Sequence, residues 1–389
     1  MDTQGIYLDY NATTPCDPRV LEKMLPYFSG IYGNPSNGLH RQGRLAAKAV
    51  DDAREQVARL IGVTSKEIFF TAGATESNNL AIFGMAGSVL AQTRKRIVTC
   101  SVEHKAVLAP CKKQAQAGFE IVVLTVDQGG RVLLNAARDA ITEDTLLVSI
   151  QIANNEIGTL QPIREISELV HAAGAVLHCD AAQAVGKLPV DMQDLGIDLC
   201  SISAHKLYGP KGVGALYINR SLRSSSLEPI ILGGGQENGV RSGTTNVSGI
   251  VGFGEACRIS NDALPEEALR ICALRDQLED GLSGNIPNLI INGKSSERLP
   301  NTSSLTFPGL DADAIILNLE TVMIGTGSAC SSGAIEPSHV LHAIGLSRPD
   351  AFSTVRISCG RYTDAIEIQI ACEELKAAYN KVASVNFIG

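Results

Sequence analysis

The first two thirds of the chain alternate between helical and extended runs of apolar positions. Val50, Ala53 and Val57 recur at helical spacing between residues 44 and 61, among charged neighbours, which predicts an amphipathic helix. Residues 68–70 form a short apolar run that is typical of a strand buried on both faces. The same alternation predicts a helix ending near Ile82, helices at residues 106–117, 136–141 and 163–173, and strands at residues 97–99, 120–126, 146–152, 175–179, 199–203 and 213–218.

The final third has a different pattern. The elements predicted there are a long amphipathic helix at residues 265–282, short strands at residues 289–291, 303–307 and 355–358, and a last helix capped by Thr363. We interpret this part as a smaller α+β domain of residues 1–15 and 260–389. Residues 16–259 would form a large α/β domain with a mainly parallel sheet flanked by helices, which binds ligands at the carboxyl ends of its strands.

Length and composition support two globular domains and exclude several classes of protein. Of the 389 residues, 44% are hydrophobic and 19% are charged, which excludes a disordered, collagenous or low-complexity chain. The formal net charge of -8 argues against general electrostatic binding of nucleic acid. The start of the chain does not read as a secretory signal, and no apolar run reaches the roughly 18 residues of a membrane span. We therefore expect a soluble, cytoplasmic protein.

The 10 cysteines need an explanation, because they fit neither a disulfide scaffold nor a metal site. No Cys-x-x-Cys pair and no zinc-like spacing occurs, so we expect reduced thiols and no metal. Cys330 differs from the others because it lies in a Gly/Ser-rich segment, residues 324–333, where a thiol is free to react. The cysteines expected to be buried within strands or helices are Cys179, Cys200, Cys272 and Cys372.

Polar side chains follow several predicted strands at their carboxyl ends. Ala74 and Thr75 open a helix after the first of these strands, where free N–H groups and a hydroxyl could hold a phosphate. Asp180 and Lys206 end two later strands, and His104 follows another. Each feature alone is ordinary, since a lysine at a sheet edge is commonly a surface residue. Together they match what pyridoxal phosphate needs: an amine, a carboxylate for the ring nitrogen, a phosphate site and a group stacked on the ring.

The chain also resembles the NifS/IscS-type cysteine desulfurases, which belong to the class V aminotransferase group and have the type I pyridoxal-phosphate fold. The resemblance covers essentially the whole chain, and its motifs are specific as an ordered set rather than one by one. These motifs lie at residues 7–15, 33–36, 71–78, 103–105, 154–158, 178–183, 203–206, 241–244, 327–330, 336–339 and 355–358.

That resemblance implies a role for each matching residue. Lys206 would bind the cofactor as a Schiff base and then act as a base, Asp180 would keep the ring nitrogen protonated, and His104 would stack on the ring. Arg356 would anchor the substrate carboxylate, with Asn34 nearby. The remaining implied contacts are Asn155 and Gln183 at the ring hydroxyl and its surroundings, Ala74, Thr75, Ser203 and His205 at the phosphate, and Thr244 at the phosphate of the other subunit of a homodimer.

The same resemblance implies the reaction. The thiolate of Cys330, on a loop of about residues 322–336, would attack the sulfur of bound L-cysteine, leaving a persulfide on the enzyme and L-alanine as product. The loop would then carry this sulfur to an acceptor or scaffold protein for iron–sulfur cluster assembly or transfer-RNA thiolation. Residues 331–334 depart from the commonest family spelling, which leaves the choice of acceptor open.

Other functions remain as alternatives. An aminotransferase or a cysteine or cystine lyase of the same fold could use Lys206 and Asp180 without Cys330, and the Gly-Ser-Ala-Cys motif argues against both. Selenocysteine lyase activity is a closer competitor, because the same site could accept the selenium analogue. A sulfur-trafficking scaffold without activity is disfavoured by the intact set of Lys206, Asp180, His104 and Cys330. The lyase class is therefore the runner-up.

Overall fold

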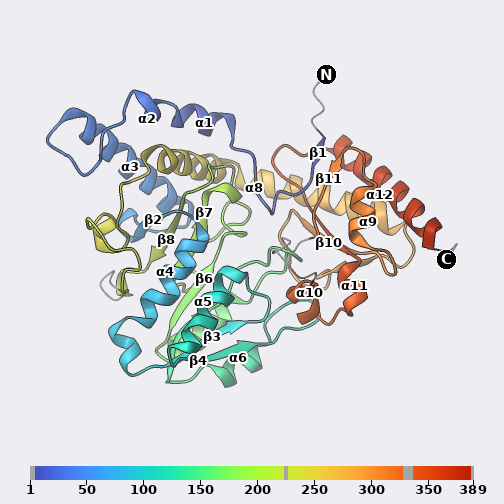
Figure 1. The fold of residues 1–389 in the computed structure, drawn as a ribbon, viewed down its shortest axis with the longest axis horizontal. Helices are drawn as coiled ribbons and strands as arrows, with labels where there is room; N and C mark the ends of the chain where they lie inside the picture. Colours follow the sequence, from blue (N-terminus) through green and yellow to red (C-terminus); the bar gives the residue numbers. More distant parts are fainter. Residues whose placement is uncertain (1–4, 223–226, 327–335, 387–389) are drawn as a thin grey trace.

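The computed structural model describes residues 5–222, 227–326 and 336–386 (Figure 1). Its largest sheet contains β2 (Ile68–Thr71), β3 (Arg96–Cys100), β4 (Glu120–Leu124), β5 (Thr145–Ser149), β6 (Val176–Asp180), β7 (Leu199–Ser203) and β8 (Gly214–Ile218). The strand order is β2-β8-β7-β6-β5-β3-β4. Only β8 runs antiparallel to its neighbours, so the predicted mainly parallel sheet is confirmed.

Helices cover both faces of this sheet. They are α1 (Pro18–Met24), α2 (Pro26–Ser29), α3 (Arg41–Leu60), α4 (Ala74–Ala86), α5 (Lys105–Gln116), α6 (Leu134–Ala140), α7 (Ile163–Ala172) and α8 (Val247–Ser283). Alternate side chains of each strand point to opposite faces, so neighbouring residues enter different cores. Phe69 packs with residues of α4 and α5, whereas Phe70 packs with residues of α3 and α8.

The rest of the chain builds smaller sheets with their own apolar core, on the other side of the molecule in Figure 1. The elements are β1 (Ile6–Tyr7), β9 (Ile290–Asn292), β10 (Thr302–Thr306), β11 (Val322–Met323), β12 (Thr354–Ser358), α9 (Ala312–Leu317), α10 (His339–Ala343), α11 (Arg348–Phe352) and α12 (Ala365–Asn386). β10 lies between β12 and β9, antiparallel to both, and β1 pairs in parallel with β11. This second core contains Leu8, Leu278, Leu305 and Ile357.

Helix α8 begins earlier than predicted. The helix expected at residues 265–282 begins at Val247 and continues through Pro265. Proline inside a helix costs about 3 kcal/mol, because it lacks an N–H and its ring crowds the preceding turn. Here Phe253 is buried in the core against the large sheet and Leu278 in the second core, so burial at both ends outweighs that cost. One helix therefore connects the two cores.

The cap of α12 also differs from the prediction. Asp364, not Thr363, precedes the first helical residue, and its Oδ1 accepts the N–H of Glu367 at 2.9 Å. Glu367 in turn accepts the N–H of Asp364 at 3.2 Å, which completes a capping box. The hydroxyl of Thr363 instead accepts the N–H of Gly360 at 3.0 Å, in the turn before the helix.

The topology brings several strand ends to one edge of the large sheet. β2 and β7 are both antiparallel to β8, and β6 is parallel to β7, so β2, β6 and β7 all end at this edge. The residues that follow these strands are therefore neighbours in space, although they are far apart in sequence. Within the described ranges, none of the helices combines the length and the apolar character that a membrane span requires.

Candidate active site

A cavity of about 1770 Å³ lies at this edge of the sheet, and residues from both sides of the molecule line it. The smaller sheets contribute Arg356 of β12, and the N-terminal segment contributes Asp9 and Asn11. The predicted site residues that line the cavity are Ala74, Thr75, His104, Asn155, Asp180, Gln183, Ser203, His205, Lys206 and Arg356.

Asp180 presents a fixed carboxylate at the end of β6. Its side chain is buried, Asn78 donates from Nδ2 to Oδ2 at 2.7 Å, and the N–H of Ala182 donates to Oδ1 at 2.9 Å. Two donors from different elements leave little freedom for the carboxylate to rotate. An oriented, buried carboxylate is suited to hold a proton on a heterocyclic nitrogen.

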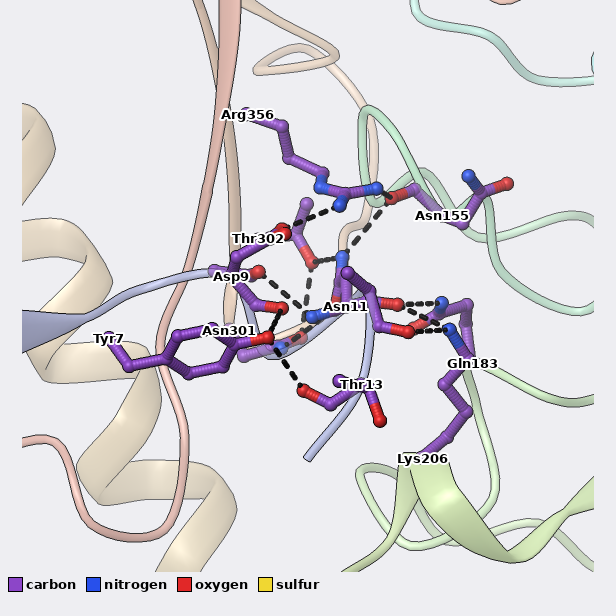
Figure 2. A network of polar contacts seen from close by, with 12 residues as sticks. Tyr7, Asp9, Asn11, Thr13, Asn155, Gln183, Lys206, Asn301, Thr302 and Arg356 are labelled. Carbon is purple, nitrogen blue, oxygen red and sulfur yellow. Dashed lines mark hydrogen bonds and ion pairs between the residues drawn. The ribbon is translucent and has the colours of Figure 1, made fainter. Parts of the chain in front are cut away.

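Lys206 follows β7 in a short turn and donates from Nζ to two main-chain carbonyls. The distances are 2.6 Å to Asn11 O and 2.8 Å to Ala12 O (Figure 2). Burial, and then the positive charge of Arg356, lower the pKa of Lys206 to about 8. The neutral, nucleophilic amine is therefore accessible near physiological pH.

The start of α4 lies in the cavity wall and could hold an anion. No side chain of the described residues caps this helix, and Gly73 precedes it with φ 149. A Cβ atom at Gly73 would lie 3.8 Å from Ser203 Oγ, so the space beside the helix start is open. Uncapped N–H groups at a helix N-terminus attract phosphate. Thr75, Ser203 and His205 add hydrogen-bonding side chains around it.

The two predicted histidines are both neutral imidazoles near pH 7. Burial, followed by Lys206 and Lys211, lowers the pKa of His205 to about 4, and its Nδ1 pairs with Thr13 Oγ1 at 3.0 Å. Burial also lowers the pKa of His104. His104 caps α5 by accepting the N–H of Ala106 on Nδ1 at 3.1 Å, so the neutral ring carries its proton on Nε2.

Arg356 is held from two sides. One guanidinium nitrogen pairs with Asp9 Oδ1 at 2.6 Å, and another donates to Asn155 O at 3.0 Å (Figure 2). Its side chain is only 7% exposed. A fixed, buried guanidinium at a cavity wall can bind a carboxylate with two hydrogen bonds.

Two of the predicted site residues that the structure describes are not in the wall of this cavity. Asn34 is exposed in the loop between α2 and α3 and does not line this chain's cavity. Thr244 is also exposed, outside this chain's own cavity. Cys330 lies outside the described residues.

Sequence reasoning missed several polar residues of the site. Asp9 and Asn11 were part of a recognised motif but received no role, because their partners are far away in sequence. Asn78 lies four positions after Ala74 on α4, a spacing that puts both on one helix face and could have identified it. Glu103, directly before His104, does not line the cavity; it is fully buried, accepts the N–H of Gln151 at 2.6 Å and has its pKa raised to about 8 by burial.

The nine described cysteines are all free thiols. Burial is the main cause that raises the pKa of each of them, so none is an activated thiolate. Cys179 and Cys200 are buried as predicted. Cys272 and Cys372 are only half-buried: Cys272 lies against the polar side chains of Arg275 and Asp276, and Cys372 packs against the second core without being fully buried in it. Among the described residues, no group of three or more His, Cys, Asp or Glu side chains could hold a metal ion.

Comparisons with known proteins find relatives along most of the chain. The model of the family described as aminotransferase class-V matches residues 6–370. A cysteine desulfurase IscS of Anaeromyxobacter sp. (strain Fw109-5) is 47% identical over 93% of this chain and 89% of its own. A cysteine desulfurase IscS of Colwellia psychrerythraea (strain 34H / ATCC BAA-681) is 46% identical over 96% of this chain and 92% of its own.

Solved structures are also similar to this chain over most of its length. A NifS-like protein matches with a TM-score of 0.89 and 37% identity, covering 97% of this chain and 99% of its own. SspA, solved in complex with cysteine, matches with a TM-score of 0.81 and 39% identity, covering 92% of this chain and 99% of its own. The fold is therefore shared along nearly the whole chain.

Proposed function

The chain belongs to the class V aminotransferase family, and on that premise we propose that it is a cysteine desulfurase, which removes sulfur from L-cysteine and leaves L-alanine. One observation of the structure supports this function above all: Lys206, Asp180 and Arg356 line one cavity. An amine, a carboxylate and a guanidinium in one cavity suit an amino acid bound beside pyridoxal phosphate. The type I pyridoxal-phosphate fold agrees with this function.

Pyridoxal phosphate is the cofactor, and the cavity residues fit it. When bound, it withdraws electrons from the substrate carbon that loses a proton. Lys206 would hold it covalently, Asp180 would keep its ring nitrogen protonated, and His104 would lie against its ring. The further contacts that we propose are Asn155 and Gln183 at the ring hydroxyl and its surroundings, and Ala74, Thr75, Ser203 and His205 with the start of α4 at the phosphate.

Arg356 and Lys206 would then act on the substrate. Arg356 binds the carboxylate of L-cysteine, and Asp9 and the carbonyl of Asn155 keep the guanidinium in place for it. Lys206 takes the proton from Cα, because its lowered pKa leaves a useful fraction as the neutral amine near pH 7 to 8. The substrate is thus held at one end while its Cα faces the base.

Cys330 would accept the sulfur. Its thiolate attacks the substrate sulfur, so a new S–S bond forms as the bond between that sulfur and the substrate Cβ breaks. The electron pair of the broken bond stays with carbon, which takes up a proton and leaves as alanine. The sulfur remains on Cys330 as a persulfide. The raised pKa values of the nine described thiols favour this tenth cysteine as the nucleophile.

We further propose a homodimer whose acceptors serve iron–sulfur cluster assembly or transfer-RNA thiolation. Leu39 and Leu232 are 95% and 81% exposed, and an interface between two copies would cover apolar side chains of this kind. The N–H of Ser242 donates to Ile231 O at 3.2 Å, so Thr244, two residues further along, lies close to the exposed Ile231 and Leu232. Thr244 would reach the phosphate bound by the second copy. Free thiols throughout the described chain favour the reducing cytoplasm.

We also propose that residues 16–259 form the large domain and that residues 1–15 and 260–389 form the small one. Two separate apolar cores support this division, with Phe70 in the first and Leu305 in the second. Helix α8 crosses the boundary, and Cys257 and Ile271 belong to different cores on either side of it. A cofactor site between two domains can change shape as they move.

The test is the turnover of L-cysteine by the purified holoenzyme with a thiol reductant, which reduces the persulfide and releases its outer sulfur as sulfide. We expect Cys330→Ala and Lys206→Ala each to lose the formation of alanine and sulfide by about a thousandfold, because each removes a covalent participant. Cys330→Ala should keep the visible absorption of bound pyridoxal phosphate, and Lys206→Ala should lose its covalent form. Cys272→Ala, which changes a half-buried cysteine of α8, is the control and should keep full turnover.

Two results would contradict this function. Unchanged release of alanine and sulfide by Cys330→Ala would exclude the persulfide route. Pyruvate in place of alanine would identify a lyase instead.

A further inference from the structure

A second lysine, Lys187, lies behind the cavity and takes no part in the steps above. It does not line the cavity, and it adjoins a small second cavity of about 20 Å³ together with Tyr10, Tyr208 and Asn301. Burial lowers the pKa of Lys187 far below its usual value, followed by the charges of Lys206 and Arg356. Burying an amine in this way is costly, and an apolar side chain would fill the space at lower cost.

Lys187 has two amide oxygens as partners. Nζ lies at 2.5 Å from Gln183 Oε1 and at 3.0 Å from Asn11 Oδ1. Asn11 Oδ1 also accepts from Asn301 Nδ2 at 2.9 Å, so it keeps a donor without Lys187. Within the described chain, Gln183 Oε1 has no donor other than Lys187. The effect of Lys187 therefore falls mainly on Gln183.

The contact with Lys187 distinguishes the oxygen end of the Gln183 amide from its nitrogen end. The Lys187 amine carries at least two N–H donors whether or not it is protonated, and it donates them to Gln183 Oε1 and Asn11 Oδ1, so this contact favours the oxygen end of the amide facing Lys187. Nε2 then points away from Lys187 and donates one N–H to Asn11 O at 3.0 Å. No described residue accepts the second N–H of Nε2, and Gln183 lines the cavity. Gln183 can thus offer a donor, and not an acceptor, to a bound molecule.

We propose that Lys187 is a positioning residue that fixes the Gln183 amide with its Nε2 end available to the ring oxygen of pyridoxal phosphate. This inference rests on the proposed function, because it needs pyridoxal phosphate in the cavity with Gln183 at its ring hydroxyl. A ring oxygen that carries negative charge requires a donor, and a flipped amide would place its own oxygen there. Without Lys187 the amide loses the partner that decides between the two orientations.

The test measures the affinity of the apoprotein for pyridoxal phosphate by titration at the visible absorption band. We expect Lys187→Met, which keeps the length of the chain without a donor, to weaken binding about tenfold, the size of one hydrogen bond to a charged group. Gln183→Met should weaken binding by a similar factor. The double variant should bind as Gln183→Met does, because Lys187 acts only through Gln183.

Two further variants serve as controls. Lys187→Arg keeps N–H donors beside the small cavity and should bind within about twofold of the unaltered protein. On the surface, Lys113 donates to Gln116 Oε1 at 2.9 Å, which is also a contact between a lysine and a glutamine. Lys113→Met should therefore leave the affinity for pyridoxal phosphate unchanged. Thermal unfolding shows which variants are folded.

The outcomes separate this inference from the proposed function. A folded Lys187→Met that binds as tightly as the unaltered protein would overturn the role of Lys187, as would a double variant whose loss is the product of the two single losses. A tenfold loss in folded Lys187→Arg would overturn it as well. Failure of the unaltered protein to bind pyridoxal phosphate would instead overturn the proposed function, and this inference with it.

Discussion

Lys206 shows how its surroundings change the chemistry of one side chain. Two carbonyls orient its amine, and burial together with Arg356 lowers its pKa to about 8. Asp180 and Asp9 act in the opposite direction, so the amine is balanced between groups of both signs. A lysine with an ordinary pKa near 10.5 would be almost wholly protonated at pH 7, and thus neither a nucleophile nor a base.

A pH dependence follows from this balance. Only the neutral amine reacts with an aldehyde, so the rate of binding of pyridoxal phosphate to the apoprotein should rise with pH around a midpoint of about 8. Arg356→Met removes a neighbouring positive charge and should move the midpoint upward. Stopped-flow absorbance measures this rate, and Arg164→Met, at an exposed ion pair with Asp194, is the control without a shift. A midpoint near 10.5 in the unaltered protein would contradict the lowered pKa.

At the scale of single elements, the start of α12 shows how local polar contacts fix a helix end. Asp364 and Glu367 accept each other's main-chain N–H groups. Both donors would otherwise lack a helical partner, because the first turn of a helix has free N–H groups. Threonine and aspartate are both good caps by sequence, so Thr363 and Asp364 could not be told apart without the structure.

This contact predicts a measurable loss of stability. Asp364→Ala should lower the free energy of unfolding by about 1 kcal/mol, because it removes the side chain that caps α12. Thr363 cannot replace it, since its hydroxyl already accepts the N–H of Gly360. Urea unfolding measures the difference. Gln369→Ala, at an exposed position of the same helix, is the matched control and should change stability by less than about 0.5 kcal/mol; an equal loss in both variants would argue against the cap.

At the scale of the whole molecule, buried ion pairs connect the two cores. Asp17, just before α1, is 1% exposed and accepts from Arg19 and from Arg361, which lies beyond β12. Hydrogen bonds from Arg19 and then Arg361 hold the pKa of Asp17 well below its usual range. A lowered pKa means that this carboxylate adds stability above its unfolded pKa of about 4, and that the stability is lost as the pH falls below it.

Removing one partner of these ion pairs should therefore lower the free energy of unfolding. Arg361→Met should lower the free energy of unfolding by about 2 to 3 kcal/mol, because Glu267 and the ring of Tyr208 lose the same guanidinium. Arg19→Met changes the 59% exposed partner of Asp17 and should cost about 1 kcal/mol or less. Urea denaturation at pH 7 compares the two variants. A larger loss for Arg19→Met than for Arg361→Met would refute the view that the buried arginine connects the cores.

Much of the fold was predictable, because the patterns that encode it are local. α3 was predicted from the spacing of Val50, Ala53 and Val57, and the structure places it at Arg41–Leu60. Asp180 and Lys206 could be predicted as partners because each ends a strand, and parallel strands end at one edge. Pro265 misled the prediction of α8, since the stabilisation that lets the helix continue comes from two cores and not from neighbouring residues.

The sequence by itself determined the type of each element and the reactive groups at the strand ends, because both depend on residues close together in the chain. Only the tertiary structure decided which partner each polar group has. Asp9 meets Arg356 across 347 residues, and Asn11 meets both Lys206 and Lys187. These contacts, and the pKa values that follow from them, come from burial and from distance in space. No spacing along the chain records either.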